Sequence, residues 1–185
     1  METVNIDLAG PYEASFGRSI YRIMFVDRPS RWMRLYDIKS KLETTMFAQM
    51  FLADINYMGT PRRFRTDNEG EFTSHSYTDF YDYAGIRRDY TPTGKPQHNA
   101  VVESGIWRAM KRGNTANFEV RRLFPGIDLA KIPNVDTVGN CLSLEAVLWD
   151  ADCLDHSTTK ETIEWRSPYE VFFTRLPELQ IVQLL

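Results

Sequence analysis

Three apolar runs in the first forty residues predict neighbouring strands. Residues 4–8 alternate between apolar and polar side chains, and the pair at 10–11, Gly-Pro, breaks the pattern. The nearly continuous apolar run at 21–26 predicts a central strand, and 32–38 predicts a third strand. Asp27–Ser30 separates these two runs and has turn chemistry. We therefore expect an antiparallel meander.

Two helices are predicted between residues 40 and 85, where apolar residues recur at helical spacing. The first predicted helix begins at a capping box, Ser40–Glu43, and ends before Gly59-Thr60-Pro61. Its apolar positions are Leu42, Met46, Met50 and Phe51. The second ends at Gly85, and its apolar positions are Tyr77, Phe80, Tyr81 and Ala84. Short strands are predicted at 63–66, between these helices, and at 86–90, after them.

A loop rich in Pro and Gly at 91–96 precedes a third predicted helix that Asn99 can cap. Residues after Arg112 are expected to be mainly helical, with 143–155 the clearest case. The resulting order, β-β-β-α-β-α-β-α, predicts an α/β fold with a five-stranded mixed sheet flanked by helices and a mainly helical C-terminal extension.

Composition narrows the class of protein. The 185 residues are enough for one domain, and 43% of them are hydrophobic, which favours a globular chain. No apolar run is long enough for a membrane span, the N-terminus lacks a signal segment, and the two cysteines, Cys141 and Cys153, are too few for a disulfide scaffold. We therefore expect an intracellular protein with free thiols and no membrane association.

Charge is unevenly distributed. The net charge of −3 argues against a strong autonomous nucleic-acid binder. However, residues 1–112 contain 16 Lys and Arg against 14 Asp and Glu, or +2, whereas residues 113–185 contain 6 against 11, or −5. The first part is therefore the more basic one, and bound metal would make its surface more positive.

Asp7, Asp67 and Glu103 are the candidate chemical groups. Each has an ordinary alternative: a carboxylate at a strand end, a turn residue in Asp-Asn-x-Gly, and a solvated residue near a helix N-terminus. If the fold brings them together, they offer the oxygen ligands that hard divalent cations take. Two such cations can flank an in-line attack on a phosphodiester.

Four ordered blocks resemble the integrase catalytic core of copia-type LTR retrotransposons, within the retroviral integrase superfamily. The blocks are Asp7-x-x-Gly10-Pro11 with Phe25-Val26-Asp27-x-x-Ser30-Arg31-Trp32, then Asp67-Asn68-x-Gly70-Glu71-Phe72, then Thr91-Pro92-x-Gly94-x-Pro96-Gln97-x-Asn99 leading to Glu103, and Ser167-Pro168-Tyr169-Glu170 in the tail. The family usually has Gly in place of Ala100 and Arg in place of Ser104, and 114–137 matches poorly.

The resemblance implies an RNase H-like fold, with a core at 1–162 and a C-terminal extension at 163–185. It implies that Asp7, Asp67 and Glu103 are catalytic and bind two Mg²⁺ or Mn²⁺ ions for DNA 3′-end processing and strand transfer. Gln97 and Asn99, with Lys95, are expected to contact DNA; helix capping by Asn99 and an ordinary loop role for Lys95 stay open. Glu71 is expected to have a structural role, and Trp32 and Trp107 are expected in the core.

The expected partners are the DNA ends of the element, target DNA and further copies of the chain, in the nucleus. His75, His98 and His156 lack zinc-finger spacing with the cysteines, so the flanking zinc-binding and C-terminal integrase domains are expected to be absent from this chain. Two alternatives remain open. One is a non-catalytic domesticated or decayed fragment that only binds nucleic acid or protein, and the other is an RNase H-like nuclease acting on RNA–DNA hybrids.

Overall fold

The computed structural model of the chain describes residues 1–91, 100–132, 135 and 142–177. Its centre is a five-stranded mixed sheet, as predicted, in the order β3-β2-β1-β4-β5. The strands are β1 (Thr3–Ala9), β2 (Tyr21–Asp27), β3 (Met33–Ile38), β4 (Arg63–Thr66) and β5 (Arg87–Tyr90). The first three strands form the predicted antiparallel meander, and β4 and β5 join it in parallel.

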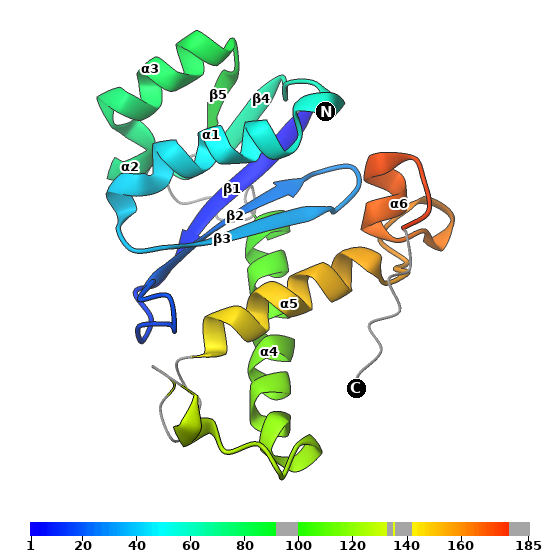
Figure 1. Cartoon of the computed structure of the whole chain (residues 1–185). Helices are drawn as coiled ribbons and strands as arrows, with labels where there is room; N and C mark the ends of the chain where they lie inside the picture. Colours follow the sequence, from blue (N-terminus) through cyan, green and yellow to red (C-terminus); the bar gives the residue numbers. More distant parts are fainter. Residues whose placement is uncertain (92–99, 133–134, 136–141, 178–185) are drawn as a thin grey trace.

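Helices cover both faces of this sheet (Figure 1). On one face lie α1 (Thr44–Asp54), α2 (Gly70–Thr73) and α3 (His75–Ala84), and on the other lie α4 (Ala100–Leu123) and α5 (Ser143–His156), which cross each other. The short helix α6 (Pro168–Phe173) lies beside the end of the β2–β3 hairpin. Four short 3-10 helices complete the described elements: η1 (Lys41–Glu43), η2 (Asn56–Met58), η4 (Leu129–Lys131) and η6 (Ile163–Trp165). None of the described helices is long and apolar enough to cross a membrane.

Alternation along the strands divides the core into two layers. In β2, Ile23 and Phe25 pack under α1 and α3, whereas Met24 and Val26 pack under α4 and α5. The first layer is largely aromatic, and Phe25 stacks on Phe51 at 4.3 Å between ring centroids. The second layer is smaller and aliphatic. A side chain that alternates with Val4 and Ile6 on β1 therefore faces α4.

The start of α1 differs from the prediction in one respect. The capping box is present, with Ser40 and Glu43 each bonded to the other's backbone, but it begins the 3-10 helix η1 and not α1. Among the predicted apolar positions only Phe51 is buried. Leu42, Met46 and Met50 are exposed, and Thr44 and Ala48 face the core instead. The apolar spacing therefore predicted the wrong face of α1 as the one that packs against the sheet.

The predicted boundary at residue 162 stays a prediction, but α6 contributes to the core. Phe172 stacks on Trp32 at 4.2 Å between ring centroids, and both side chains are buried. Ser167 begins α6 with a second capping box, paired with Glu170. This confirms Trp32 as a core residue and ties the C-terminal part of the described chain to the β2–β3 hairpin.

Candidate active site

Asp7 lies on the central strand and faces α4. Val4 and Ile6 on β1 point into the aromatic layer. Asp7 comes directly after Ile6 in the strand, so its half-buried side chain lies on the opposite face of the sheet. Its Oδ1 accepts a hydrogen bond from the Leu8 backbone N–H at 2.9 Å. The strand therefore fixes both the position and the orientation of this carboxylate.

Asp67 follows the strand next to the one that bears Asp7. The parallel register pairs Thr3 with Arg63 and Asn5 with Arg65, and Asp67 follows Arg65 by two residues just as Asp7 follows Asn5. Adjacent strands are about 4.8 Å apart, so the two backbones are close here. Asp67 directly follows the last residue of β4, and its Oδ1 accepts the Glu69 backbone N–H at 3.2 Å in a turn that leads into α2.

Glu103 approaches the site from the helix that covers this face of the sheet. It lies in the first turn of α4, as predicted, and is exposed. Two residues later, Gly105 lets the helix approach β2 closely, because a Cβ at this position would lie 3.2 Å from the Met24 sulfur. The start of α4 is therefore held against the sheet face that bears Asp7.

Asp7 is affected electrostatically by the other two carboxylates. The pKa of Asp7 is raised to about 7, first by burial and then by the negative charges of Asp67, Glu103 and Glu69. Burial also raises the pKa of Asp67, and Glu69 and Glu71 raise it further. The structure thus brings Asp7 within range of the charges of both Asp67 and Glu103.

The three carboxylates do not form a metal-binding cluster in this structure. Among the described residues, no group of three His, Cys, Asp or Glu side chains is close enough together to hold a metal ion as the side chains stand. The donor chemistry is nevertheless suitable, since all three offer carboxylate oxygens, the ligands of hard divalent cations. A cation would also offset the negative charges of Asp67, Glu103 and Glu69, which add to the effect of burial on the pKa of Asp7.

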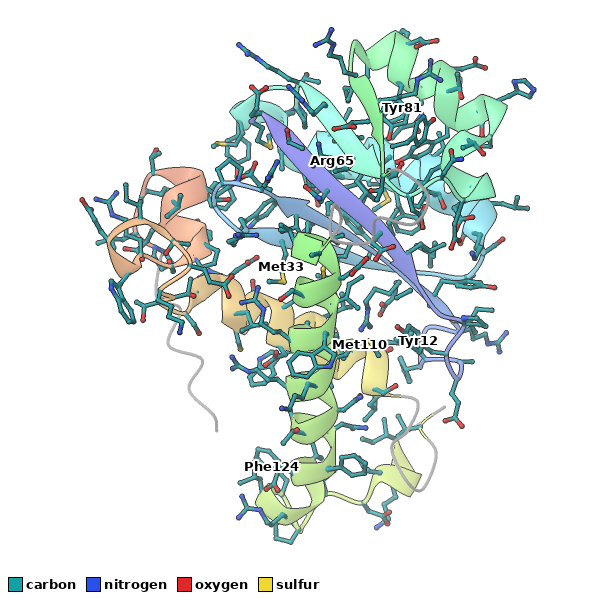
Figure 2. The ribbon with its side chains drawn as sticks, turned by 180° about the vertical axis from the view of Figure 1, so that it is seen from behind. Tyr12, Met33, Arg65, Tyr81, Met110 and Phe124 are labelled. Atoms are coloured by element: carbon teal, nitrogen blue, oxygen red, sulfur yellow. The ribbon has the colours of Figure 1, made fainter. Side chains whose placement is uncertain are left out.

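Two residues near the site were missed from the sequence. The Tyr12 hydroxyl donates to the Met110 sulfur at 3.1 Å, and Figure 2 shows these two side chains side by side. Burial raises the pKa of Tyr12, and the charge of Asp7 adds to this, so Tyr12 borders the site. Lys41 bonds to Glu69 and Glu71, on either side of Gly70. No sequence motif marks these contacts, because their partners are 28 to 98 residues away.

Other predicted contacts have mixed outcomes. Lys95, Gln97 and Asn99 lie outside the described residues. The three arginines at 62–65 are paired with acids within the molecule: Arg62 and Arg63 bond to Glu2, and Arg65 bonds to Asp89. The prediction for Trp107 was wrong, since it is 62% exposed on α4, with the Lys111 ammonium 4.9 Å from its ring centroid.

Comparison with known proteins gives matches in both sequence and fold. A family model described as "Integrase core domain" matches residues 2–96, which include Asp7 and Asp67 but not Glu103. A retrovirus-related Pol polyprotein from transposon TNT 1-94 of Nicotiana tabacum is 35% identical over 106 residues, or 56% of this chain. The match spans only 8% of the length of that polyprotein.

The fold resembles that of a solved structure, the HTLV-2 integrase catalytic core domain in complex with magnesium, in a trimeric form. The TM-score is 0.61, and the match covers 92% of this chain and 95% of that chain. Sequence identity is 14%, so this likeness concerns the fold alone, which is the predicted RNase H-like fold.

Proposed function

The chain belongs to the integrase core domain family, and from that premise we propose that it is the catalytic core of a polynucleotidyl transferase that carries out metal-dependent DNA 3′-end processing and strand transfer. The observation that carries the proposal is that Asp7, on β1, lies within range of the charges of Asp67, after β4, and of Glu103, on α4; burial raises the pKa of Asp7 to about 7, and these two charges add to the shift. An isolated carboxylate at a strand end would not have such neighbours.

In this proposal Asp7 and Asp67 would hold one Mg²⁺ or Mn²⁺ ion, and Asp7 and Glu103 would hold a second. Bound in this way, the ions supply the positive charge that activates the attacking oxygen, from water or a DNA 3′-hydroxyl, and stabilises the leaving 3′-oxygen. Asp7 would be the shared ligand, which agrees with its being the residue on which the charges of both Asp67 and Glu103 act. The backbone N–H groups of Leu8 and Glu69 each orient one carboxylate through its Oδ1.

Because the three side chains are spread apart among the described residues, binding must draw Asp67 and Glu103 in toward Asp7. Asp7 would also lose the proton that its raised pKa allows it to keep near neutral pH. Lys95, Gln97 and Asn99 remain the proposed DNA contacts. Assembly into a homo-oligomer and action in the nucleus on the DNA ends of the element are parts of the same proposal.

The spread of the carboxylates also favours a second candidate, a non-catalytic fragment that binds nucleic acid or protein without turnover. The Ser104 side chain, where the family usually has Arg, fits this candidate as well. Such a fragment would bind its partners without a metal requirement.

A disintegration assay on labelled branched DNA distinguishes the two candidates. We expect product with Mn²⁺ and none with EDTA. Asp67→Asn should reduce the rate at least about a thousandfold, because the charge stabilisation that it removes is worth several kcal/mol. Asp79→Asn, an exposed aspartate on α3, is the matched control and should retain activity. DNA binding without product, unchanged by EDTA, would support the non-catalytic fragment instead.

A further inference from the structure

Lys41 connects two elements that are otherwise separate at the edge of the candidate active site. It is the first residue of η1, just before α1, and its ammonium group reaches the turn between β4 and α2. The Nζ atom lies 3.0 Å from Glu69 Oε2 and 2.9 Å from Glu71 Oε1. We call these three residues the Lys41 bridge.

The bridge acts on the turn that carries Asp67. Glu69 donates its backbone N–H to Asp67 Oδ1, and the Phe72 backbone N–H in turn donates to the Glu69 carbonyl at 3.1 Å. Phe72 is buried in the aromatic layer. The turn that begins at Asp67 is therefore held at two points: Phe72 anchors it in the aromatic layer, and Lys41 binds Glu69 and Glu71.

Burial makes the bridge more than a surface ion pair. The Glu71 side chain is only 7% exposed, whereas those of Lys41 and Glu69 are 41% and 55% exposed. A nearly buried carboxylate needs a charged partner, and Lys41 supplies it. The Lys41 ammonium also lies 5.9 Å from the centre of the Tyr21 ring on β2, which restricts the position of its long side chain.

Charge supports the same role. Asp67, Glu69 and Glu71 are three acids within five residues. The Lys41 ammonium, in contact with both glutamates, offsets part of this negative charge beside Asp67. Hydrogen bonds to Glu71 and Glu69 raise the pKa of Lys41 itself, so the lysine stays charged.

We propose that Lys41 is a positioning residue, which holds the Asp67 turn against η1 through Glu69 and Glu71 and thereby sets the affinity of the carboxylate site for a divalent cation. This inference rests on the proposed function for the identity of the site. Lys41 itself does not bind the metal; its two carboxylate partners occupy its ammonium group.

The test compares Lys41→Met and Lys41→Arg with Lys39→Met, a matched control two residues away whose side chain is exposed. Two measurements need no DNA. The first is the affinity for Mn²⁺ alone, from the electron paramagnetic resonance signal of free Mn²⁺. The second is amide hydrogen exchange of Glu69 and Phe72 in the metal-free full chain.

We expect Lys41→Met to weaken Mn²⁺ binding about tenfold, within the 10- to 100-fold range typical of residues that orient metal ligands. Exchange at Glu69 and Phe72 should become faster, while exchange in β2 stays unchanged. Lys41→Arg should recover most of the affinity because it keeps the charge and the donors, and Lys39→Met should match the wild type.

A fourth variant, Lys41→Met combined with Glu71→Gln, guards against misfolding. It removes the unpaired buried carboxylate, so it should fold at least as well as Lys41→Met while still binding Mn²⁺ weakly. Affinity restored to the wild-type value in this variant would overturn the proposal, because the weakening would then come from the stranded charge of Glu71 alone.

Three further outcomes are distinct. Unchanged Mn²⁺ affinity and unchanged exchange in Lys41→Met would overturn the proposal, even if the KM for DNA rose, because Lys41 would then act as a phosphate contact. A wild-type chain that binds no Mn²⁺ would overturn it as well. A wild-type chain that binds Mn²⁺ in a Lys41-dependent way but yields no disintegration product would support the bridge and contradict the proposed function.

Discussion

At the scale of single residues, Asp155 is a carboxyl group in an environment that disfavours its charge. It lies near the end of α5, is 3% exposed, and accepts the Met33 backbone N–H with both carboxylate oxygens, at 3.0 and 3.2 Å. Burial raises its pKa well above the ordinary value, against the smaller opposing effects of this hydrogen bond and of Arg34 and Arg108. The folded state therefore favours the protonated form.

This shift predicts how the stability of the protein depends on pH. In the unfolded chain Asp155 ionises near its ordinary pKa of about 3.9. The folded state keeps the proton to higher pH, so above about pH 4 it binds more protons than the unfolded state and the contribution of Asp155 to stability falls as pH rises. The loss continues until pH reaches the raised folded-state pKa.

Asp155→Asn should remove this fall, because the amide oxygen can still accept the Met33 N–H but cannot ionise. We expect the variant to gain stability over the wild type as pH rises from 5 to 8, measured by urea unfolding at each pH. Asp79→Asn is the exposed control and should give a constant difference. A difference for Asp155→Asn that also stays constant with pH would contradict the raised pKa.

Single residues were predictable from the sequence where a motif fixed their place. Asp67 is an example, because the Asp-Asn-x-Gly motif and the end of a short strand locate it. Lys41 was not predictable, since its role depends on partners brought near by the fold. The exposure of Trp107 also could not be inferred, because a helix of 24 residues has several faces and its buried face carries few large apolar side chains: Val102 and Ala109 are buried, beside Gly105 and Gly113.

At the scale of elements, the crossing of α4 and α5 depends on one glycine. A Cβ built on Gly113 would lie 2.6 Å from the Val147 Cα and 2.8 Å from its backbone nitrogen. Backbone atoms cannot move aside as the end of a flexible side chain can. The two helices can therefore keep this distance only while residue 113 has no side chain.

Gly113→Ala should separate the helices and destabilise the protein by about 1 to 3 kcal/mol, the usual cost of overpacking, despite the better helix propensity of alanine. Thermal unfolding measures this loss. Gly126→Ala is the control, because a Cβ there meets nothing within 4 Å. Equal melting temperatures for both variants would show that the crossing is looser than described.

Strands were predicted more accurately than helices at this scale. Period-two alternation identifies β1 and a continuous apolar run identifies β2, because each strand contacts the core on a fixed face. The buried face of α1 was misassigned because Leu42, Met46, Met50 and Phe51 recur at helical spacing, but of these four only Phe51 is buried in the core. The four-residue α2 has no apolar repeat and was missed.

At the scale of the whole molecule, a bound cation should stabilise the entire fold. Asp7, Asp67 and Glu103 come from a meander strand, the end of a parallel strand and the helix that covers this face of the sheet, so an ion held by all three would join the sheet to α4. Their mutual repulsion is also greatest without metal. The topology itself was predictable, since the order of elements was sufficient to indicate this mixed sheet.

We expect free Mn²⁺ at a hundred times its dissociation constant to add about 2.7 kcal/mol to the free energy of unfolding. For a domain of this size that is a rise of about 5 to 10 °C in Tm, measurable by differential scanning calorimetry. Asp67→Asn should lose most of the rise. A rise of the same size in that variant would place the bound ion elsewhere on the molecule.

The hydrogen bond from Met33 to Asp155 has a consequence for solubility. A strand at the border of a sheet offers unpaired N–H groups, to which a strand of another molecule can add. On β3 the outward N–H of Met33 is already donated to a carboxylate of α5, and at the other border β5 presents the exposed charges of Arg87 and Arg88. A second chain cannot extend the sheet at Met33 without first displacing α5, so the helix that completes the second layer also helps to protect the chain from aggregation.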